Sequence, residues 1–274
     1  MSLINYFAAF LFLQDKRKLE DMLSKNKIKF IQSLDRKRIR EEHGVFLAEG
    51  NKLVEEALAS GFEIELLVCT GDFFSKRNID PASASEIIIT DKENIKKASL
   101  LQSPQETLAV IKKPSPAVSE IKCAGRLSLA LDCIQDPGNL GTILRIANWF
   151  GIDQIICSRD TVDGYNPKVV QASMGAIFRV KLVHTELLDF LQHEKELGCP
   201  VYGAFLDGKN IYWQQLSPTG ILVMGNEGNG ISSEIEPLIS ERLFIPSFAE
   251  NNSKPESLNV AVATAICCSE FRRR

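Results

Sequence analysis

The feature that most constrains the fold is the alternation of short apolar runs with longer amphipathic segments from residue 126 to the C-terminus. The apolar runs have the length and composition of buried strands, and the segments between them have the spacing of helices. The predicted strands are 126–134, 153–158, 179–183, 200–206, 220–225 and 241–246. The predicted helices lie within 136–151, 167–178, 185–198, 233–239 and 257–271. This pattern predicts an α/β domain with a mainly parallel sheet covered by helices.

The first half of the chain predicts a second, smaller α/β unit. Helices are expected at 46–61 and 92–101, and strands at 63–69, 85–90 and 107–113. The stretch KKPSPAVSEIK, residues 112–122, contains two prolines and no apolar period, so it is interpreted as a linker. The expected organisation is therefore an extension at 1–24, a small domain at 25–112, a linker at 113–122 and a larger domain at 123–274.

Composition excludes several classes of protein. The formal net charge of −3 argues against a protein that coats nucleic acid with an overall basic surface, although it allows a local basic face. Seven cysteines without C-x-x-C spacing indicate reduced, mostly buried thiols in a cytoplasmic protein. With three histidines in the chain, no metal site is expected.

The N-terminal apolar run, within 1–18, lacks a basic start and a small-residue cleavage site, and it is too short to span a bilayer. It is interpreted as an extra amphipathic helix or as residues upstream of the natural start. No membrane association is expected.

Positive charge is concentrated between Lys16 and Arg40, where ten Lys and Arg residues face three Asp and Glu residues. Such a run can be a solvated helix surface, or it can bind the phosphates of RNA or DNA. The candidate nucleic-acid contacts are Lys27, Lys29, Arg36, Lys37, Arg38 and Arg40.

Three predicted strands end in loops that contain asparagine: QDPGNLG (135–141), GNEGNG (225–230) and IPSFAENNSKPESLN (245–259). Ligands of parallel sheets bind beyond the carboxyl ends of the strands, so a site is expected where these loops meet. The amides of Asn139, Asn226 and Asn259 can both donate and accept hydrogen bonds, and Arg145 can hold a phosphate with two of them. No P-loop follows any of the turns, which argues against a nucleotide hydrolase.

The segments DPGNLGTILRIANWFG, VMGNEGNGIS and IPSFAENNSKPESLNVAVATAI resemble, in order, the three motifs of the SpoU/TrmH family of RNA ribose methyltransferases, within the SPOUT superfamily. YNPKVVQASMGAIFRV is similar to a further stretch of that family, and the resemblance covers residues 127–274. The first half resembles the substrate-binding domain of members that act on ribosomal RNA, which is similar to an RNA-binding fold of ribosomal proteins.

The resemblance implies a deep trefoil knot, a homodimer through the methyltransferase domain, and S-adenosylmethionine as cofactor. It implies transfer of a methyl group to a ribose 2′-hydroxyl, with ribosomal (23S) RNA favoured as substrate. A transfer-RNA methyltransferase and a non-catalytic RNA-binding ribosome-assembly factor remain as alternatives.

The resemblance also carries residue roles to matching positions. The implied catalytic residues are Arg145, Asn139, Glu227, Ser257 and Asn259. The implied cofactor-binding residues are Met224, Gly225, Asn226, Gly228, Ile245, Pro246, Ser257, Leu258 and Asn259. We expect Arg145 to hold an RNA phosphate and stabilise the developing alkoxide, because a guanidinium stays protonated and cannot act as a base. Asn139 and Ser257 are expected to position the ribose or Arg145, and Glu227 to fix the arginine or its loop.

One departure from the family pattern concerns the third motif. The path from Pro246 to Ser257 is longer than in most members, and Ala249 replaces a glycine. This insertion is expected to alter the wall on the adenine side of the cofactor pocket.

Overall fold

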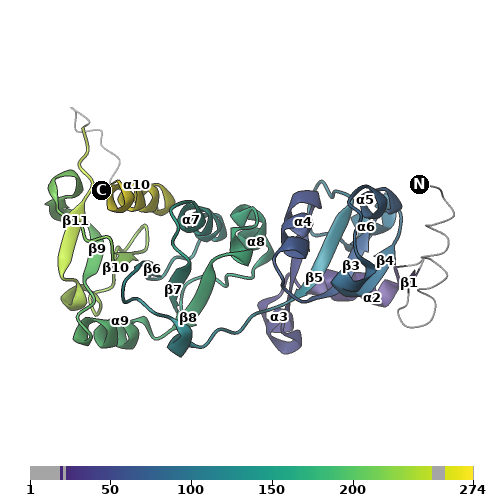
Figure 1. Cartoon of the computed structure of the whole chain (residues 1–274), viewed down its shortest axis with the longest axis horizontal. Coiled ribbons are helices and arrows are strands. Elements are labelled where there is room, and N and C mark those ends of the chain that lie inside the picture. Colours follow the sequence, from purple (N-terminus) through teal and green to yellow (C-terminus); the bar gives the residue numbers. More distant parts are fainter. Residues whose placement is uncertain (1–18, 21–22, 249–256, 274) are drawn as a thin grey trace. The chain divides into compact units, whose positions relative to one another are not determined.

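The computed structural model of the chain describes residues 19–20, 23–248 and 257–273 (Figure 1). The chain forms two compact units. Unit 1 extends to Lys113 and includes Tyr165–Pro167, and unit 2 comprises 114–164 and 168–274. The N-terminal extension predicted at 1–24 lies almost entirely outside the described residues.

Unit 1 contains a five-stranded mixed sheet in the order β1-β4-β3-β5-β2. Strands β1, β3 and β4 are parallel neighbours, whereas β5 pairs antiparallel with both β3 and β2. The strands are β1 (Leu19–Glu20), β2 (Val45–Glu49), β3 (Ile64–Cys69), β4 (Ala84–Ile89) and β5 (Thr107–Lys112). The helices are α2 (Lys25–Ser33), α3 (Lys37–His43), α4 (Asn51–Ala59), α5 (Gly71–Lys76) and α6 (Lys92–Ala98).

The prediction of one helix over 46–61 was wrong for its first part. Residues 45–49 form β2, with all five residues buried, and pair antiparallel with β5. Gly50 follows with φ of 99°, a value that excludes helical continuation, and α4 begins one residue later. Helix α5 was not predicted, and it begins where Thr70 accepts a hydrogen bond from the backbone N–H of Phe73.

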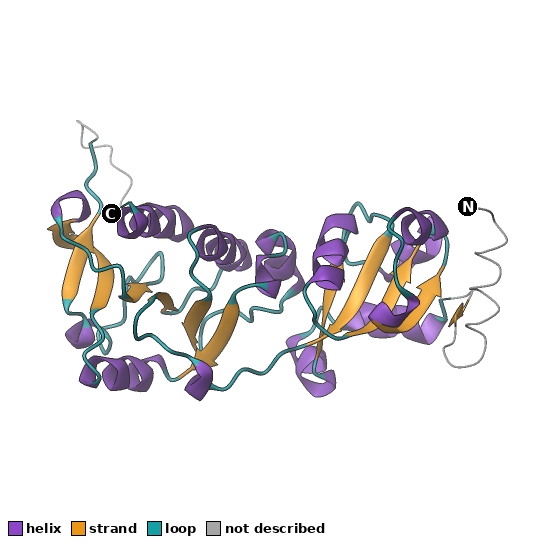
Figure 2. Ribbon diagram, in the orientation of Figure 1, coloured by secondary structure: helices purple, strands orange, loops and turns teal. Residues whose placement is uncertain are grey.

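Unit 2 is built on a six-stranded sheet in the order β11-β9-β10-β6-β7-β8, with every neighbouring pair parallel. The strands are β6 (Leu127–Leu131), β7 (Gln154–Ser158), β8 (Lys181–Thr185), β9 (Val201–Asn210), β10 (Gly220–Met224) and β11 (Glu241–Phe244). The helices are α7 (Pro137–Trp149), α8 (Pro167–Ser173), α9 (Leu187–Glu196) and α10 (Val260–Arg272) (Figure 2). The predicted α/β class with a parallel-rich sheet is confirmed.

Two details of unit 2 differ from expectation. The helix predicted over 233–239 is a single 3₁₀ turn at Glu236–Leu238, because Pro237 limits further helical hydrogen bonding. Strand β9 runs on to Asn210, with an irregularity in its pairing to β11 between Arg242 and Leu243.

Packing in unit 2 brings α7 and α10 side by side (Figure 1). A core of apolar residues from β6, β7, β9, β10 and α9 lies against the sheet, including Ala130, Ile156, Leu191, Val201 and Val223. On another side, Gly141 of α7 lies so close to α8 that an added Cβ would be 2.4 Å from the Cβ of Ala172. This packing fixes the start of α7 relative to the strands. The predicted trefoil knot stays a prediction, because residues 249–256 between β11 and α10 lie outside the described part.

Candidate active site

The first loop of the site positions the start of α7. Asp136 is the N-cap, and its Oδ1 accepts a hydrogen bond of 2.8 Å from the backbone N–H of Asn139. Pro137 occupies the first turn, where its missing N–H costs nothing. The side chain of Asn139 therefore projects from the first turn of a firmly capped helix.

The second loop is a closed turn after β10. The backbones of Asn226 and Gly230 exchange hydrogen bonds of 2.9 and 2.8 Å, and Asn226 Oδ1 accepts from the N–H of Gly228 and Asn229. Asn226 Nδ2 donates to the carbonyl of Cys133, 2.8 Å away, which ties this loop to the first. At Gly225 an added Cβ would lie 2.2 Å from the backbone carbon of Gly230, so a side chain does not fit there. Asn226 thus organises the turn that presents Glu227.

The third loop ends at Asn259, the N-cap of α10. Asn259 Oδ1 accepts from the backbone N–H groups of Ala261 and Val262, at 3.1 and 3.3 Å. This capping bond fixes the rotamer of the side chain and turns its Nδ2 toward the other two loops.

The three loops meet in a hydrogen-bonded cluster of Asn139, Glu227 and Asn259, named here the amide–carboxylate cluster. Glu227 Oε1 accepts from Asn139 Nδ2 at 2.9 Å and from Asn259 Nδ2 at 2.7 Å. Asn259 Nδ2 also lies 2.9 Å from Asn139 Oδ1, and the backbone N–H of Val260 donates to Glu227 Oε1 at 3.2 Å. The carboxylate lies at the N-terminus of α10, where the helix dipole favours negative charge. The structure therefore unites the three loops that the sequence suggested would meet.

Two of the predicted catalytic residues do not join this cluster. Arg145 lies exposed on α7, and Ser257 lies exposed before α10. Within the described residues, neither side chain makes a hydrogen bond or ion pair. Glu227 consequently contacts the loops and not Arg145, which leaves the guanidinium open to a ligand.

Asp132 is a site residue that the sequence interpretation did not select. It is 5% exposed, and its Oδ2 accepts a 2.7 Å hydrogen bond from the backbone N–H of Ser232, just after the second loop. Its own N–H donates to the carbonyl of Met224, 2.9 Å away. An acidic residue directly after a buried strand was the signal that could have identified it.

The basic residues predicted to contact RNA differ in exposure. Lys29, Arg36, Lys37 and Arg38 are exposed, whereas Lys27 is half-buried and forms an ion pair with Glu86. Arg40 is 1% exposed, and its Nη1 donates to the carbonyls of Leu34 and Asp35 at 2.7 and 2.8 Å. The prediction that Arg40 contacts RNA was therefore wrong: its guanidinium stabilises the turn between α2 and α3.

No group of three or more His, Cys, Asp or Glu side chains that could hold a metal occurs within 23–248 and 257–273. All seven cysteines are free thiols. Burial raises the pKa of Cys69 and of Cys267 to about 12, so these thiols stay protonated at neutral pH. Among the described helices, none combines the length and apolar character that crossing a membrane requires.

Sequence comparison identifies both units. The profile of the SpoU rRNA Methylase family matches residues 126–269. The chain belongs to the SpoU rRNA methylase family. The profile of the MRM3-like substrate binding domain matches residues 25–109.

Relatives of this SpoU family chain extend over nearly its whole length. It is 31% identical to the 23S rRNA (guanosine(2553)-2′-O)-methyltransferase of Bacillus subtilis over 90% of this chain and 96% of that protein. A TrmH-family structure from Porphyromonas gingivalis is 42% identical, with a TM-score of 0.81, over 92% of this chain and 99% of that one. The AdoMet-bound rRNA methyltransferase of Sinorhizobium meliloti is 30% identical, with a TM-score of 0.81, over 94% of this chain and 98% of that one.

Enzymes of the SpoU family use S-adenosylmethionine, and the loops here offer suitable groups for it. The half-buried backbones of Gly225 and Ile245 make no hydrogen bond to the described residues, so their N–H and carbonyl groups are available to a ligand. Pairs of backbone donors and acceptors suit the edge of an adenine ring. Part of the third loop, 249–256, lies outside the described residues, and with it the insertion that distinguishes this chain.

Proposed function

We propose that this protein transfers a methyl group from S-adenosylmethionine to a ribose 2′-hydroxyl of large-subunit (23S) ribosomal RNA. The observation that carries the proposal is the amide–carboxylate cluster, because it ties the three motif loops together beside the helix that bears Arg145. The relative from Bacillus subtilis, named as a 23S rRNA 2′-O-methyltransferase, supports this choice of substrate.

The proposed mechanism divides the work among three groups of residues. S-adenosylmethionine, when bound, supplies a methyl group already activated on a sulfonium. The proposed cofactor contacts are Met224, Gly225, Asn226, Gly228, Ile245, Pro246, Ser257, Leu258 and Asn259. Arg145 binds the RNA phosphate beside the target ribose and stabilises the oxyanion that forms as the 2′-hydroxyl releases its proton to water. The amide–carboxylate cluster keeps the three loops in the geometry that in-line transfer needs, and Ser257 contacts the ribose.

We also propose a homodimer formed through unit 2. Trp149 at the end of α7 is 84% exposed and Val262 on the adjacent α10 is 48% exposed. Large exposed apolar side chains on two packed helices are typical of a surface that binds another protein. We further propose that the protein acts in the cytoplasm. Residues 25–112 would bind the RNA, and residues 113–122 would form a linker. Residues 123–274 would form the catalytic domain, which contains the trefoil knot.

RNA binding by unit 1 is expected to depend on the exposed cations at the N-terminal end of α3, which are Arg36, Lys37 and Arg38. Replacing Arg36, Lys37 and Arg38 with glutamine should weaken RNA binding about tenfold at moderate salt and lower the salt slope by about 2, since each lost phosphate contact accounts for roughly 0.7. The measurement is RNA affinity across a salt series. A triple replacement of Lys76, Lys92 and Lys96, exposed cations elsewhere in unit 1, provides the charge-matched control. Equal effects of the two triple variants would contradict a localised RNA surface.

The decisive test of the function is a map of 2′-O-methylated nucleotides in total RNA from cells with and without the protein. We expect one 23S position to lose its methyl group in cells without the protein. The same position should regain the methyl group when purified protein and S-adenosylmethionine are added. Loss of a methyl group from transfer RNA would favour the transfer-RNA alternative. No change in either RNA, together with no thermal shift on adding S-adenosylmethionine, would favour a non-catalytic assembly factor.

A further inference from the structure

Unit 2 contains a second polar concavity, at the edge of the sheet opposite the three loops. Its volume is about 350 Å³, and it is lined by residues that precede β6, β7 and β8, among them Gly125, Arg126, Asp153 and Arg179, together with Asn148 near the end of α7. Because all strands are parallel, the amino ends lie at one edge and the carboxyl ends, with the amide–carboxylate cluster, at the other. We refer to this concavity as the amino-edge pocket.

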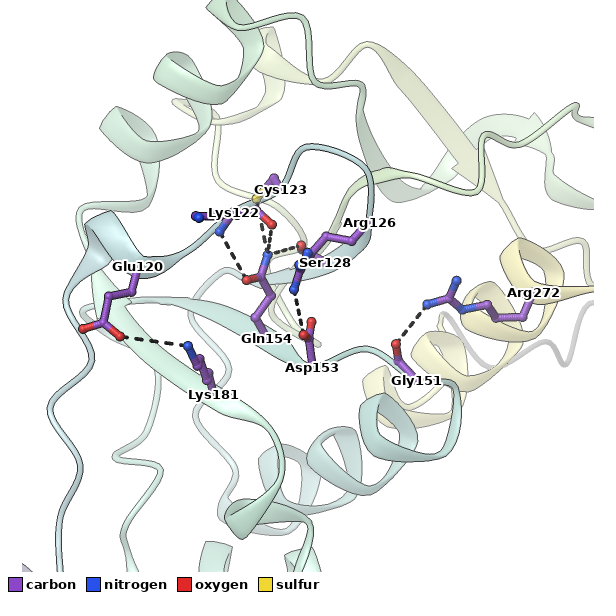
Figure 3. Close-up of polar contacts among 10 residues, drawn as sticks. All are labelled: Glu120, Lys122, Cys123, Arg126, Ser128, Gly151, Asp153, Gln154, Lys181 and Arg272. Carbon is purple, nitrogen blue, oxygen red and sulfur yellow. Dashed lines mark hydrogen bonds and ion pairs between the residues drawn. The ribbon is translucent and has the colours of Figure 1, made fainter. Parts of the chain in front are cut away.

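A buried glutamine holds one side of the amino-edge pocket in place. Gln154 is 2% exposed, and its Nε2 donates to the carbonyl of Lys122 at 2.9 Å and to Ser128 Oγ at 2.6 Å (Figure 3). Its Oε1 also accepts from the N–H of Lys122. The chain that leads into β6 and carries Arg126 is thereby fixed to the start of β7.

The C-terminal helix contacts one of the segments that line the pocket, the end of α7 at Gly151. Arg272 of α10 donates to the carbonyl of Phe150 at 2.8 Å, where α7 ends. It also donates to the carbonyl of Gly151 at 3.1 Å (Figure 3). These carbonyls form the negative end of the α7 dipole, and the guanidinium compensates for it. The pocket wall is therefore less negative than the end of a helix would otherwise make it.

Charge around the pocket is positive although the chain as a whole is acidic. Its lining includes two arginines, Arg126 and Arg179, and one carboxylate, Asp153. Lys122 and Lys181 lie nearby, and Lys181 pairs with Glu120 (Figure 3). The formal net charge of the chain is −3, so this excess is a local feature. Arg126 pairs with Asp153 at 2.7 Å, but the two side chains remain 44% and 60% exposed, so water and ligands can reach both.

We propose that the amino-edge pocket binds a phosphodiester unit of the substrate RNA, as a contact separate from the methyl-transfer site. Arg126 and Arg179 both line this concavity, and Arg179 Nη1 also donates to the carbonyl of Gly175 at 3.3 Å. Planar guanidinium groups suit bidentate binding of phosphate oxygens. The concavity is open to solvent, and its volume of about 350 Å³ is sufficient for a ribose phosphate. The RNA contact extends the footprint of the enzyme to two opposite edges of one sheet. This proposal rests on the proposed function, because it assumes an RNA substrate.

The test compares two variants that break the same ion pair with opposite effects on charge. Arg126→Gln removes a cation, and Asp153→Asn removes an anion, while each abolishes the Arg126–Asp153 bridge. Binding of a fluorescein-labelled, mixed-sequence 20-nucleotide RNA is measured by anisotropy across a salt series. We expect Arg126→Gln to weaken binding about fivefold, with a salt slope lower by about 0.7, and Asp153→Asn to strengthen binding about twofold. A purely structural role of the bridge would shift both variants in the same direction.

The possible outcomes separate this proposal from the proposed function. If the map of 2′-O-methylated nucleotides shows no 23S position that depends on the protein, the proposed function itself fails. If the wild type binds but both variants keep its affinity and salt slope, only the amino-edge contact is refuted. A parallel titration with fluorescent AMP distinguishes a free nucleotide: loss of AMP binding in Arg126→Gln with unchanged RNA binding would also overturn the proposal.

Discussion

Replacing Arg145 with alanine is expected to lower the rate of methyl transfer by about 10²–10³-fold while leaving affinity for S-adenosylmethionine unchanged. Loss of one group that stabilises a developing oxyanion has this magnitude in other enzymes. Arg145 is exposed on α7, and its side chain bonds to none of the described residues. Removing it should therefore leave the stability of the fold unchanged. The measurements are transfer of labelled methyl to RNA and calorimetric titration with the cofactor.

Two further variants sharpen the Arg145 experiment. Arg145→Lys keeps the positive charge but loses the planar fork, so it should recover only part of the rate. Arg159→Ala removes another exposed arginine of unit 2, one that pairs with Glu186, and should retain wild-type activity. Wild-type turnover by Arg145→Ala would exclude this residue from the reaction.

The parallel sheet of unit 2 was predictable mainly from its central strands β6 and β10, which are apolar on both faces. All five residues of β6 and of β10 are buried, and such runs stand out in a sequence between amphipathic helices. Strand β2 is just as buried, yet it was assigned to a helix. Its five residues adjoin a strongly helical segment without a proline or a polar turn, and only the φ of Gly50 separates the two.

The prediction that Arg40 contacts RNA was wrong for a different reason. Its neighbours Arg36, Lys37 and Arg38 are exposed, and composition treats the four cations alike. The position of Arg40 on α3 directs its side chain beneath the turn at Leu34 and Asp35, whose carbonyl oxygens need donors. Burial of a single guanidinium within a basic run depends on tertiary packing, which periodicity over a seven-residue helix does not reveal.

The position of the candidate site could be predicted from the sequence, but its hydrogen bonds could not. Three loops at the carboxyl ends of parallel strands must lie at one edge, which sequence alone implies. The hydrogen bonds of Glu227 depend on how its neighbours are held. The helix caps at Asp136 and Asn259 and the closed turn around Asn226 determine which amide donates to which carboxylate oxygen. The contribution of Asp132 is likewise invisible without the structure, because it acts through the backbone of Ser232, one hundred residues later in the chain.

Replacing Glu227 with alanine is expected to reduce methyl transfer about a hundredfold with only a small change in the unfolding temperature. Glu227 Oε1 accepts from both asparagines and from the N–H of Val260, so its loss releases the three loops from one another. A displacement of about 1 Å in a reacting geometry costs approximately this factor in rate. Stability should change little because the carboxylate is exposed, and water can hydrate the donors it leaves. The measurements are single-turnover transfer rates and thermal unfolding.

The conservative variant Glu227→Gln distinguishes positioning from charge. A glutamine carbonyl can still accept from Asn139, Asn259 and the N–H of Val260, although a neutral acceptor binds less strongly than a carboxylate. If Glu227 acts by holding the loops, glutamine should restore most of the rate that alanine loses, and both variants should keep the pH profile of the wild type. A glutamine variant as slow as the alanine variant would instead mean that the negative charge itself takes part in catalysis. The cluster would then act on the substrate directly, and its hydrogen bonds to the asparagines would serve to orient the carboxylate.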